Sequence, residues 1–215
     1  MSVGNFLRNV LGPKRFTFVA RYYRLIFVDL EKVAGVFAAV LPPNAHVIDV
    51  GGGDGEGINH LIRLRTDLQI TMIDIAENIG NSITSGQHER VRILPKTSVR
   101  EYTENFMESF DAIVVGDVIH HIPSVDRLSF FQDILHLCTR NNKPVMVIIK
   151  DIETNGVISF LGYLSDRYVS NDRHVKFVSQ KDLIAQLVTV FPQATFYDTH
   201  LSRMNYPNYV FYFLT

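Results

Sequence analysis

Short runs of apolar residues, rich in valine and isoleucine, alternate with segments of helical periodicity along most of this chain. Strands that are buried on both faces of a sheet have this continuous apolar character. The pattern predicts five such strands, at His46–Val50, Gln69–Ile73, Val91–Leu94, Ala112–Val115 and Val145–Ile149. It predicts helices between them at Gly57–Leu64, Glu77–Ser85, Thr103–Glu108 and Leu128–Leu137. Strands that alternate with helices indicate a parallel sheet with right-handed crossover connections.

The two ends of the chain depart from this alternation. Residues 1–40 carry apolar side chains at helical spacing and predict one or two helices. Near the other end, a predicted helix at Gln180–Val190 precedes two β-rich runs, Ala194–Asp198 and Tyr209–Leu214. The ten residues between these runs are too few for a helical crossover, so we expect an antiparallel hairpin. The sheet then has seven strands, one of them reversed.

Length and composition narrow the class of protein. A chain of 215 residues fits one α/β domain with additional lid segments. We expect a helical lid at residues 1–43 and the main domain at 44–215, with a lid insertion at about residues 152–178. The formal charge of −1, from 21 basic and 22 acidic residues, gives no electrostatic footprint for nucleic acid.

The N-terminal apolar stretch is interrupted by Arg21, Arg24 and Asp29, so it cannot span a bilayer or serve as a signal core. We therefore expect a cytoplasmic protein that is not integral to a membrane. The single cysteine, Cys138, lies in an apolar helical pattern, which predicts a buried and inert thiol.

A glycine-rich segment follows the first predicted strand. Glycine occupies positions 51, 52, 53, 55 and 57, just before a predicted helix. Glycines allow a ligand to touch the main chain, and the free N–H groups of a helix N-terminus favour an anionic group. Asp74, at the end of the next strand, can accept hydrogen bonds from ribose hydroxyls. Together these features predict a nucleotide-type site.

The spacing of the glycines separates the candidate ligands. The dinucleotide fingerprint requires glycine at i, i+2 and i+5, but Glu56 and Ile58 occupy the i+5 positions counted from Gly51 and Gly53. The sequence instead reads Asp-x-Gly-x-Gly-x-Gly from Asp49 to Gly55. The Asp49 carboxylate would repel a pyrophosphate, whereas it suits a ligand that carries an amino group.

This Asp-x-Gly-x-Gly-x-Gly segment resembles the first motif of the class I S-adenosylmethionine-dependent methyltransferases, and Ile73-Asp74-Ile75 resembles their ribose-binding motif. Residues 110–123, which include His120-His121-Ile122-Pro123, are similar to the fourth-strand signature of small-molecule methyltransferases related to the ubiquinone-biosynthesis C-methylases. The resemblance covers residues 44–150. It implies a Rossmann-like seven-stranded sheet of order 3-2-1-4-5-7-6 with the last strand antiparallel and helices on both faces.

The resemblance also implies a cofactor, S-adenosylmethionine, with S-adenosylhomocysteine as product, bound at the carboxyl ends of the strands. The matching positions are Asp49, Gly51, Gly52, Gly53, Gly55, Asp74, Ile75, Ser98, Val99, Gly116 and Asp117. This chain departs from the family after its third strand, where many members carry Gly-Asp and the carboxylate binds the adenine amino group. Here Ser98 would have to accept that bond through its hydroxyl or its carbonyl.

Methyl transfer by in-line displacement requires a positioned nucleophile and, where needed, removal of a proton. His120 and His121, expected on the first turn of the next helix, are candidate general bases. Asp151 is a candidate to orient the acceptor; its alternative role is a helix cap. For His121 the alternative is a structural role beneath the sheet. Asp117 and the two histidines match a metal-ligand set of some relatives, but adjacent histidines diverge on a helix, so we expect no metal.

Aromatic residues in both predicted lids suggest a small acceptor that is apolar or aromatic, with lipid- or polyketide-like character. Tyr22, Tyr23, Tyr163 and Arg167 are the predicted acceptor-binding residues. We expect a monomer or homodimer that binds no nucleic acid. Two other functions stay open: a non-catalytic binding or scaffold protein with the methyltransferase fold, and a nicotinamide-dependent oxidoreductase, which the glycine spacing disfavours.

Overall fold

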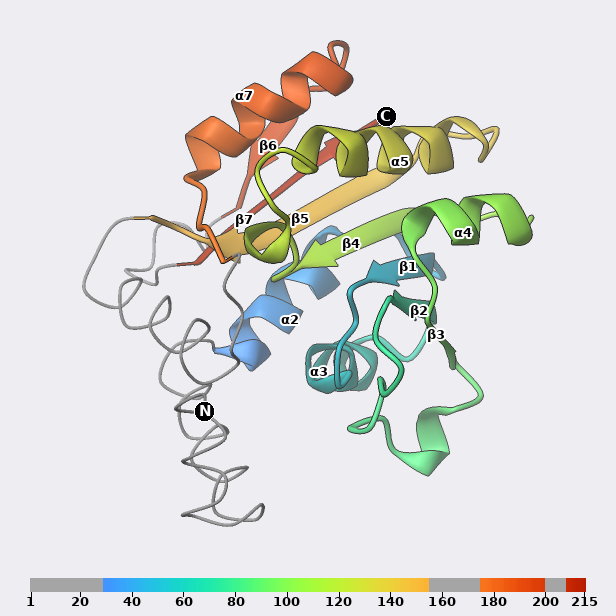
Figure 1. Ribbon diagram of the computed structural model, residues 1–215. Helices are drawn as coiled ribbons and strands as arrows, with labels where there is room; N and C mark the ends of the chain where they lie inside the picture. Colours follow the sequence, from blue (N-terminus) through green and yellow to red (C-terminus); the bar gives the residue numbers. More distant parts are fainter. Residues whose placement is uncertain (1–28, 155–174, 200–207) are drawn as a thin grey trace, which may run out of the picture.

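The computed structural model describes residues 29–154, 175–199 and 208–215, and a seven-stranded sheet lies at its centre (Figure 1). The strands are β1 (His46–Val50), β2 (Gln69–Asp74), β3 (Val91–Pro95), β4 (Ala112–Gly116), β5 (Met146–Ile152), β6 (Phe196–Asp198) and β7 (Asn208–Leu214). Their order is β3-β2-β1-β4-β5-β7-β6. Only β7 runs against its neighbours β5 and β6, so the predicted topology, with its reversed strand, is confirmed.

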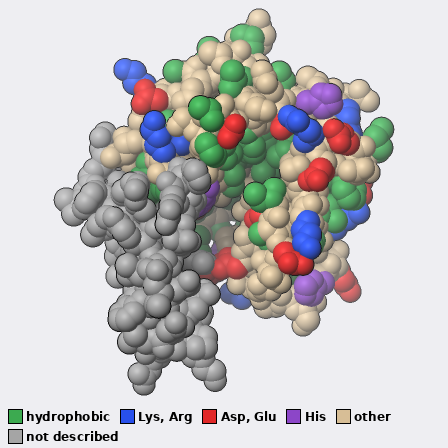
Figure 2. Space-filling model, in the orientation of Figure 1, with side chains coloured by type: hydrophobic (Ala, Val, Ile, Leu, Met, Phe, Trp, Pro, Cys, Tyr) green, Lys and Arg blue, Asp and Glu red, His purple; other side chains and the backbone are tan. Residues whose placement is uncertain are grey.

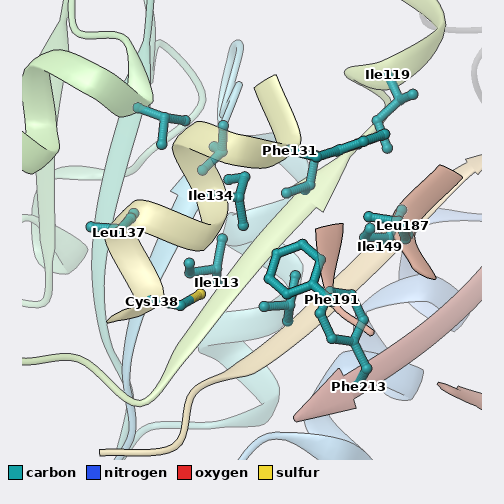
Figure 3. Packing of buried hydrophobic residues seen from close by; sticks show 14 of the residues in the cluster. Ile113, Ile119, Phe131, Ile134, Leu137, Cys138, Ile149, Leu187, Phe191 and Phe213 are labelled. Atoms are coloured by element: carbon teal, nitrogen blue, oxygen red, sulfur yellow. The ribbon is translucent and has the colours of Figure 1, made fainter. Parts of the chain in front are cut away.

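Helices cover both faces of the sheet (Figure 1). The helices α2 (Leu30–Val40) and α3 (Glu56–Leu64) pack on one face. The helices α4 (Val99–Asn105), α5 (Arg127–Thr139) and α7 (Gln180–Val190) pack on the other. Figure 3 shows this second layer, in which Ile134 and Cys138 of α5 lie near Ile113 of β4. Apolar burial on both faces explains why the central strands are continuous runs of valine and isoleucine.

Helix α4 begins at Val99, earlier than the predicted Thr103–Glu108, and it ends at Asn105. Its start is fixed by a capping box in which the Ser98 hydroxyl accepts the N–H of Glu101 and the Glu101 carboxylate accepts the N–H of Ser98. The apolar periodicity of the sequence contains no signal for this polar cap, so the predicted start of the helix is too late.

The predicted helix at Glu77–Ser85 is wrong. This segment is a loop followed by one 3₁₀ turn at Ser85–Gln87. Gly80 has a left-handed backbone, with φ of 69°, and its N–H donates to the Gly53 carbonyl at 2.8 Å. The N–H of Ser82 donates to Asp54 at 2.8 Å. These amides bond to the glycine-rich loop instead of to carbonyls four residues earlier, so the segment packs as a second loop beside the first.

Cys138 is buried, as predicted, and burial raises the pKa of its thiol to about 12, which keeps it protonated and inert at neutral pH.

Among the residues that the structure describes, no helix is long and apolar enough to cross a membrane.

Arg65, which follows α3, holds the end of α2 and the loop after it. Its guanidinium donates to the carbonyls of Ala38 at 2.8 Å, Leu41 at 3.0 Å and Pro42 at 2.7 Å, and it is braced by the carboxylate of Asp67. The last carbonyls of a helix have no partner within the helix, so this side chain supplies their donors.

Replacing Arg65 with leucine should therefore lower the free energy of unfolding by about 1–3 kcal/mol, because the carbonyls lose charged donors. Arg63 lies exposed on the same helix and gives a matched control, for which Arg63→Leu should cost under about 0.5 kcal/mol. Urea unfolding followed by circular dichroism measures both variants. Equal losses in the two would contradict the role assigned to Arg65.

Candidate functional site

The described site residues gather at one edge of the sheet, where β1, β2, β4 and β5 have their carboxyl ends. Asp49 lies near the end of β1, Asp74 ends β2, and Gly116 ends β4 beside Lys150 of β5. In Figure 2 the surface seen in the orientation of Figure 1 is hollowed near its middle, with hydrophobic and acidic side chains around the hollow. Ligands of open α/β sheets bind at this edge.

The glycine loop between β1 and α3 is built so that no side chain intrudes. Gly51 has φ of 72°, and a Cβ there would lie 2.3 Å from Cγ2 of Val118. Gly55 has φ of 81° and is the N-cap of α3, and the N–H of Glu56 in the first turn donates to the carboxylate of Asp54 at 3.2 Å. Gly52 and Gly53 complete the turn between them. The loop therefore presents main-chain atoms, which is the property predicted for a cofactor cradle.

Asp49 is buried just beneath this loop, with 6% of its surface exposed. Burial and the nearby charge of Asp74 raise the pKa of its carboxyl to about 7. A carboxylate held in such surroundings gains stability from a cationic ligand group. The amino group inferred for the ligand from the sequence fits this requirement.

Asp74 receives the N–H of Gly53 at 3.1 Å and the N–H of Ala76 at 2.9 Å, so its carboxylate is fixed between the two loops. The next side chain, Ile75, is 79% exposed although it is strongly apolar. An apolar side chain left open beside a fixed carboxylate is suited to cover the flat face of a base whose ribose the carboxylate holds.

Ser98 and Val99 lie at the start of α4, next in line along the same edge. The Ser98 hydroxyl already accepts the N–H of Glu101 and donates to its carboxylate at 2.7 Å, and the Ser98 carbonyl accepts the N–H of Tyr102. The amide of Val99 belongs to the first helical turn, where intrahelical acceptors are missing. The adenine contacts predicted for Ser98 and Val99 stay predictions.

The connection after β4 starts with Gly116 and Asp117. Asp117 has a left-handed backbone, with φ of 58°, which is rare for a residue other than glycine. Its N–H donates to the Lys150 carbonyl at 3.0 Å, and its carboxylate pairs with the Lys150 ammonium. The Lys150 side chain is 2% exposed and that of Asp117 is 41% exposed. The pair therefore joins the sheet interior to the site.

His120 and Asp151 form a buried dyad. The ring Nδ1 of His120 lies 2.5 Å from Oδ1 of Asp151, and the His120 N–H donates to Oδ2 at 3.1 Å. Burial alone would raise the pKa of Asp151, but the charge and hydrogen bond of His120 outweigh it and keep this pKa below its ordinary value. An ionised Asp151 fixes the tautomer in which Nδ1 carries the proton, so Nε2 is the basic nitrogen.

His120 and His121 differ in their surroundings. They lie on a 3₁₀ turn, Ile119–His121, and not on the first turn of α5, which begins at Arg127. The predicted position on that helix is therefore wrong, because the segment bonds to β5 and to residues near 176 before α5 starts. His120 is buried while His121 is exposed, and their rings lie 4.1 Å apart.

Among the described residues, one group of side chains could hold a metal ion. Asp117, His120 and Asp151 each offer one ligand atom, and these atoms lie within 4.8 Å of one another. His121 is not part of the group. The Lys150 ammonium already pairs with Asp117, and Asp151 already accepts from His120, so a divalent ion would have to displace both contacts.

Lys176 and Phe177 form a short segment, called the strap below, that contacts His120 of the dyad. The N–H of Lys176 donates to the His120 carbonyl at 2.9 Å, and the Phe177 ring meets the His120 ring edge-on at 5.3 Å. Arg127 is buried and donates to the carbonyls of Ile122 and Lys176, which ties the strap to the histidine turn. The strap therefore fixes the orientation of the His120 ring.

Four predicted acceptor residues, Tyr22, Tyr23, Tyr163 and Arg167, lie outside the described residues. Two buried cations near the dyad, Lys150 and Arg127, are absent from the predicted site residues. Lys150 carries a signal in the sequence, since it is a cation directly after the apolar run Val145–Ile149. Arg127 carries none, because its contact with the Lys176 carbonyl joins segments far apart in the sequence.

Comparisons with known proteins agree with this geometry. Residues 48–143 match the family model described as a methyltransferase domain. Among curated protein sequences, none matches the chain significantly.

Three solved structures share the fold. An O-methyltransferase family protein from Burkholderia thailandensis has a TM-score of 0.62 and 15% identity over 86% of this chain and 54% of its own. The mitomycin 7-O-methyltransferase MmcR has a TM-score of 0.64 and 17% identity over 99% of this chain and 60% of its own. The neocarzinostatin O-methyltransferase NcsB1, solved with S-adenosylmethionine and 2-hydroxy-5-methyl naphthoic acid, has a TM-score of 0.64 and 14% identity over 99% and 61%.

The chain thus spans little more than half of the length of these proteins. At such identity the likeness establishes a shared fold, the Rossmann-like fold of the class I methyltransferases. It does not single out the ubiquinone-related C-methylases, so that finer resemblance stays a prediction.

Proposed function

We propose that the chain, whose residues 48–143 match the methyltransferase-domain model, methylates a hydroxyl group of a small apolar or aromatic molecule with S-adenosylmethionine as donor. The observation that carries this proposal is the buried His120–Asp151 dyad beside the glycine loop. Both elements are needed, because the loop selects the cofactor and the dyad removes a proton from the acceptor. The fold shared with the mitomycin 7-O-methyltransferase and the O-methyltransferase from neocarzinostatin biosynthesis supports it.

The residues of the edge fit the proposed cofactor from one end to the other. The Asp49 carboxylate takes the amino group of the methionine moiety, and Asp74 takes the ribose hydroxyls. The open side chain of Ile75 and the amide of Val99 suit the adenine ring. When bound, S-adenosylmethionine supplies a methyl carbon whose bond to sulfur breaks as the acceptor oxygen bonds to it, leaving the electron pair on sulfur.

The chain's own part in the reaction is to hold the acceptor and move its proton. Nε2 of His120 takes the hydroxyl proton, and the adjacent carboxylate of Asp151 stabilises the imidazolium that forms. Phe177 and the strap shield the ring from water. The predicted acceptor contacts Tyr22, Tyr23, Tyr163 and Arg167 stay a prediction, and of the predicted N-terminal lid the described part, α2, packs on the sheet.

Replacing Asp74 with alanine should weaken S-adenosylhomocysteine binding by about 1–3 kcal/mol, because two ribose hydroxyls lose a charged acceptor. Glu89→Gln removes the same charge from an exposed turn before β3 and should leave affinity unchanged. Isothermal titration calorimetry measures both. An Asp74→Ala protein that binds as tightly as the wild type would reject the ribose assignment.

The function itself is tested by incubating the protein with S-adenosylmethionine and a panel of hydroxyarenes, including 2-hydroxy-5-methyl naphthoic acid. Mass spectrometry should detect S-adenosylhomocysteine and a methyl ether in equal amounts. Binding of the cofactor without any methylated product across the panel would favour the scaffold alternative. Methylation at carbon or nitrogen with no ether product would contradict the proposed hydroxyl acceptor.

A further inference from the structure

The last residues of β5 hold the two ends of the connection that leads from β4 to His120. Ile148 packs in the cluster under α2 and α3, whereas Ile149 packs in the cluster under α4, α5 and α7. Side chains alternate along a strand, so Lys150 and Asp151 point toward opposite faces. Each nevertheless reaches the same short connection at the sheet edge.

The contacts of Lys150 act on the start of this connection, at Asp117. Its carbonyl accepts the Asp117 N–H at 3.0 Å, and its ammonium pairs with the Asp117 carboxylate. A non-glycine residue with φ of 58° is held in a conformation that L-residues rarely adopt and that is strained. A buried lysine is itself costly unless it is paired, so both unfavourable features depend on one contact.

The far end of the connection is His120, whose N–H and ring both bond to Asp151. Between the two ends, Val118 fills the space that a side chain at position 51 would occupy in the glycine loop. A rotation at Asp117 would therefore move Val118 against the loop and pull His120 away from Asp151.

We propose that Lys150 is a positioning residue, which locks Asp117 in its left-handed conformation and thereby sets the place of His120. This rests on the proposed function only for its effect on turnover. Its effect on the geometry of the dyad is independent of any acceptor.

The direct readout is the low-field proton resonance of a histidine Nδ1–H bonded to a carboxylate, assigned by its loss in Asp151→Asn. Lys150→Met should shift or abolish this signal in the full-length protein, and His121→Gln should leave it in place. In methylation assays Lys150→Met should lower kcat at least about tenfold and change the Kd of S-adenosylhomocysteine less than about threefold.

A second pair of variants covers the case in which Lys150→Met does not fold. Asp117→Gly and Asp117→Ala both remove the carboxylate, but only glycine adopts a φ of 58° without strain. The histidine signal should persist in the glycine variant and weaken in the alanine variant. Identical signals in these two, or a wild-type signal in Lys150→Met, would overturn the proposal. Loss of S-adenosylhomocysteine binding by the wild type would instead overturn the proposed function.

Discussion

The His120→Gln variant should lose about 10²–10⁴-fold in kcat while it binds S-adenosylhomocysteine as the wild type does. Glutamine can keep the hydrogen bond to Asp151 but has no basic nitrogen at neutral pH, so the acceptor keeps its proton. The ring lies beside the cofactor cradle and is not part of it, which is why affinity for the product should not change. Steady-state kinetics and calorimetry on the same preparation separate the two effects.

His121→Gln is the matched control, because it removes an exposed imidazole from the adjacent position. It should keep kcat within about threefold of the wild type, because the proposed proton transfer uses the ring of His120 that is bonded to Asp151. Asp151→Asn should resemble His120→Gln, because it removes the charge that fixes the tautomer. If His121→Gln were the inactive variant and His120→Gln the active one, the assignment of the base would be wrong.

Asp49→Asn should weaken S-adenosylmethionine binding about 10–100-fold at pH 8 and make the ligand-free protein more stable. The carboxyl has a folded pKa of about 7 against an ordinary value of 3.8. Between these values the unfolded chain is ionised while the folded protein keeps the proton. Ionising this buried group therefore costs stability as the pH rises from about 4 to about 7, and the full cost, about 2–4 kcal/mol, applies above pH 7.

The cofactor's ammonium favours the ionised form, so binding to the wild type should release a proton below pH 7 and strengthen as the pH rises through 7. In Asp49→Asn the affinity should not follow this dependence. Thermal unfolding and calorimetry across pH 5–8 measure both, with Glu89→Gln as the control for loss of one charge. A wild-type affinity that is flat across pH 7 would count against an amino group at Asp49.

The five parallel strands could be predicted because burial on both faces leaves a continuous apolar run in each of them, whereas their order was implied by the resemblance to the class I methyltransferases. The hairpin at the end followed from the short connection before β7. The helix expected at Glu77–Ser85 failed because its amides bond to Gly53 and Asp54, which are distant in sequence. Local periodicity contains no information about such contacts.

Part of the site could also be predicted from the sequence, and part could not. Asp49, Asp74 and the glycines stand at fixed positions relative to their strands, so spacing alone could place them at one edge. The partnership of His120 with Asp151 could not be predicted, because it depends on a 3₁₀ turn that meets β5 across a large gap in sequence. The role of Lys150 could not be predicted, because it appears only through the contact with Asp117 and the unusual backbone of that residue.

The central claim is that the edge around Asp49, Asp74 and the glycine loop binds S-adenosylmethionine. Isothermal titration calorimetry of the full chain with S-adenosylmethionine, S-adenosylhomocysteine and NAD tests it most directly. We predict one-to-one binding of both sulfur nucleotides, weakened in Asp74→Ala, and no binding of NAD. Binding of NAD alone, or of none of the three, would contradict the account.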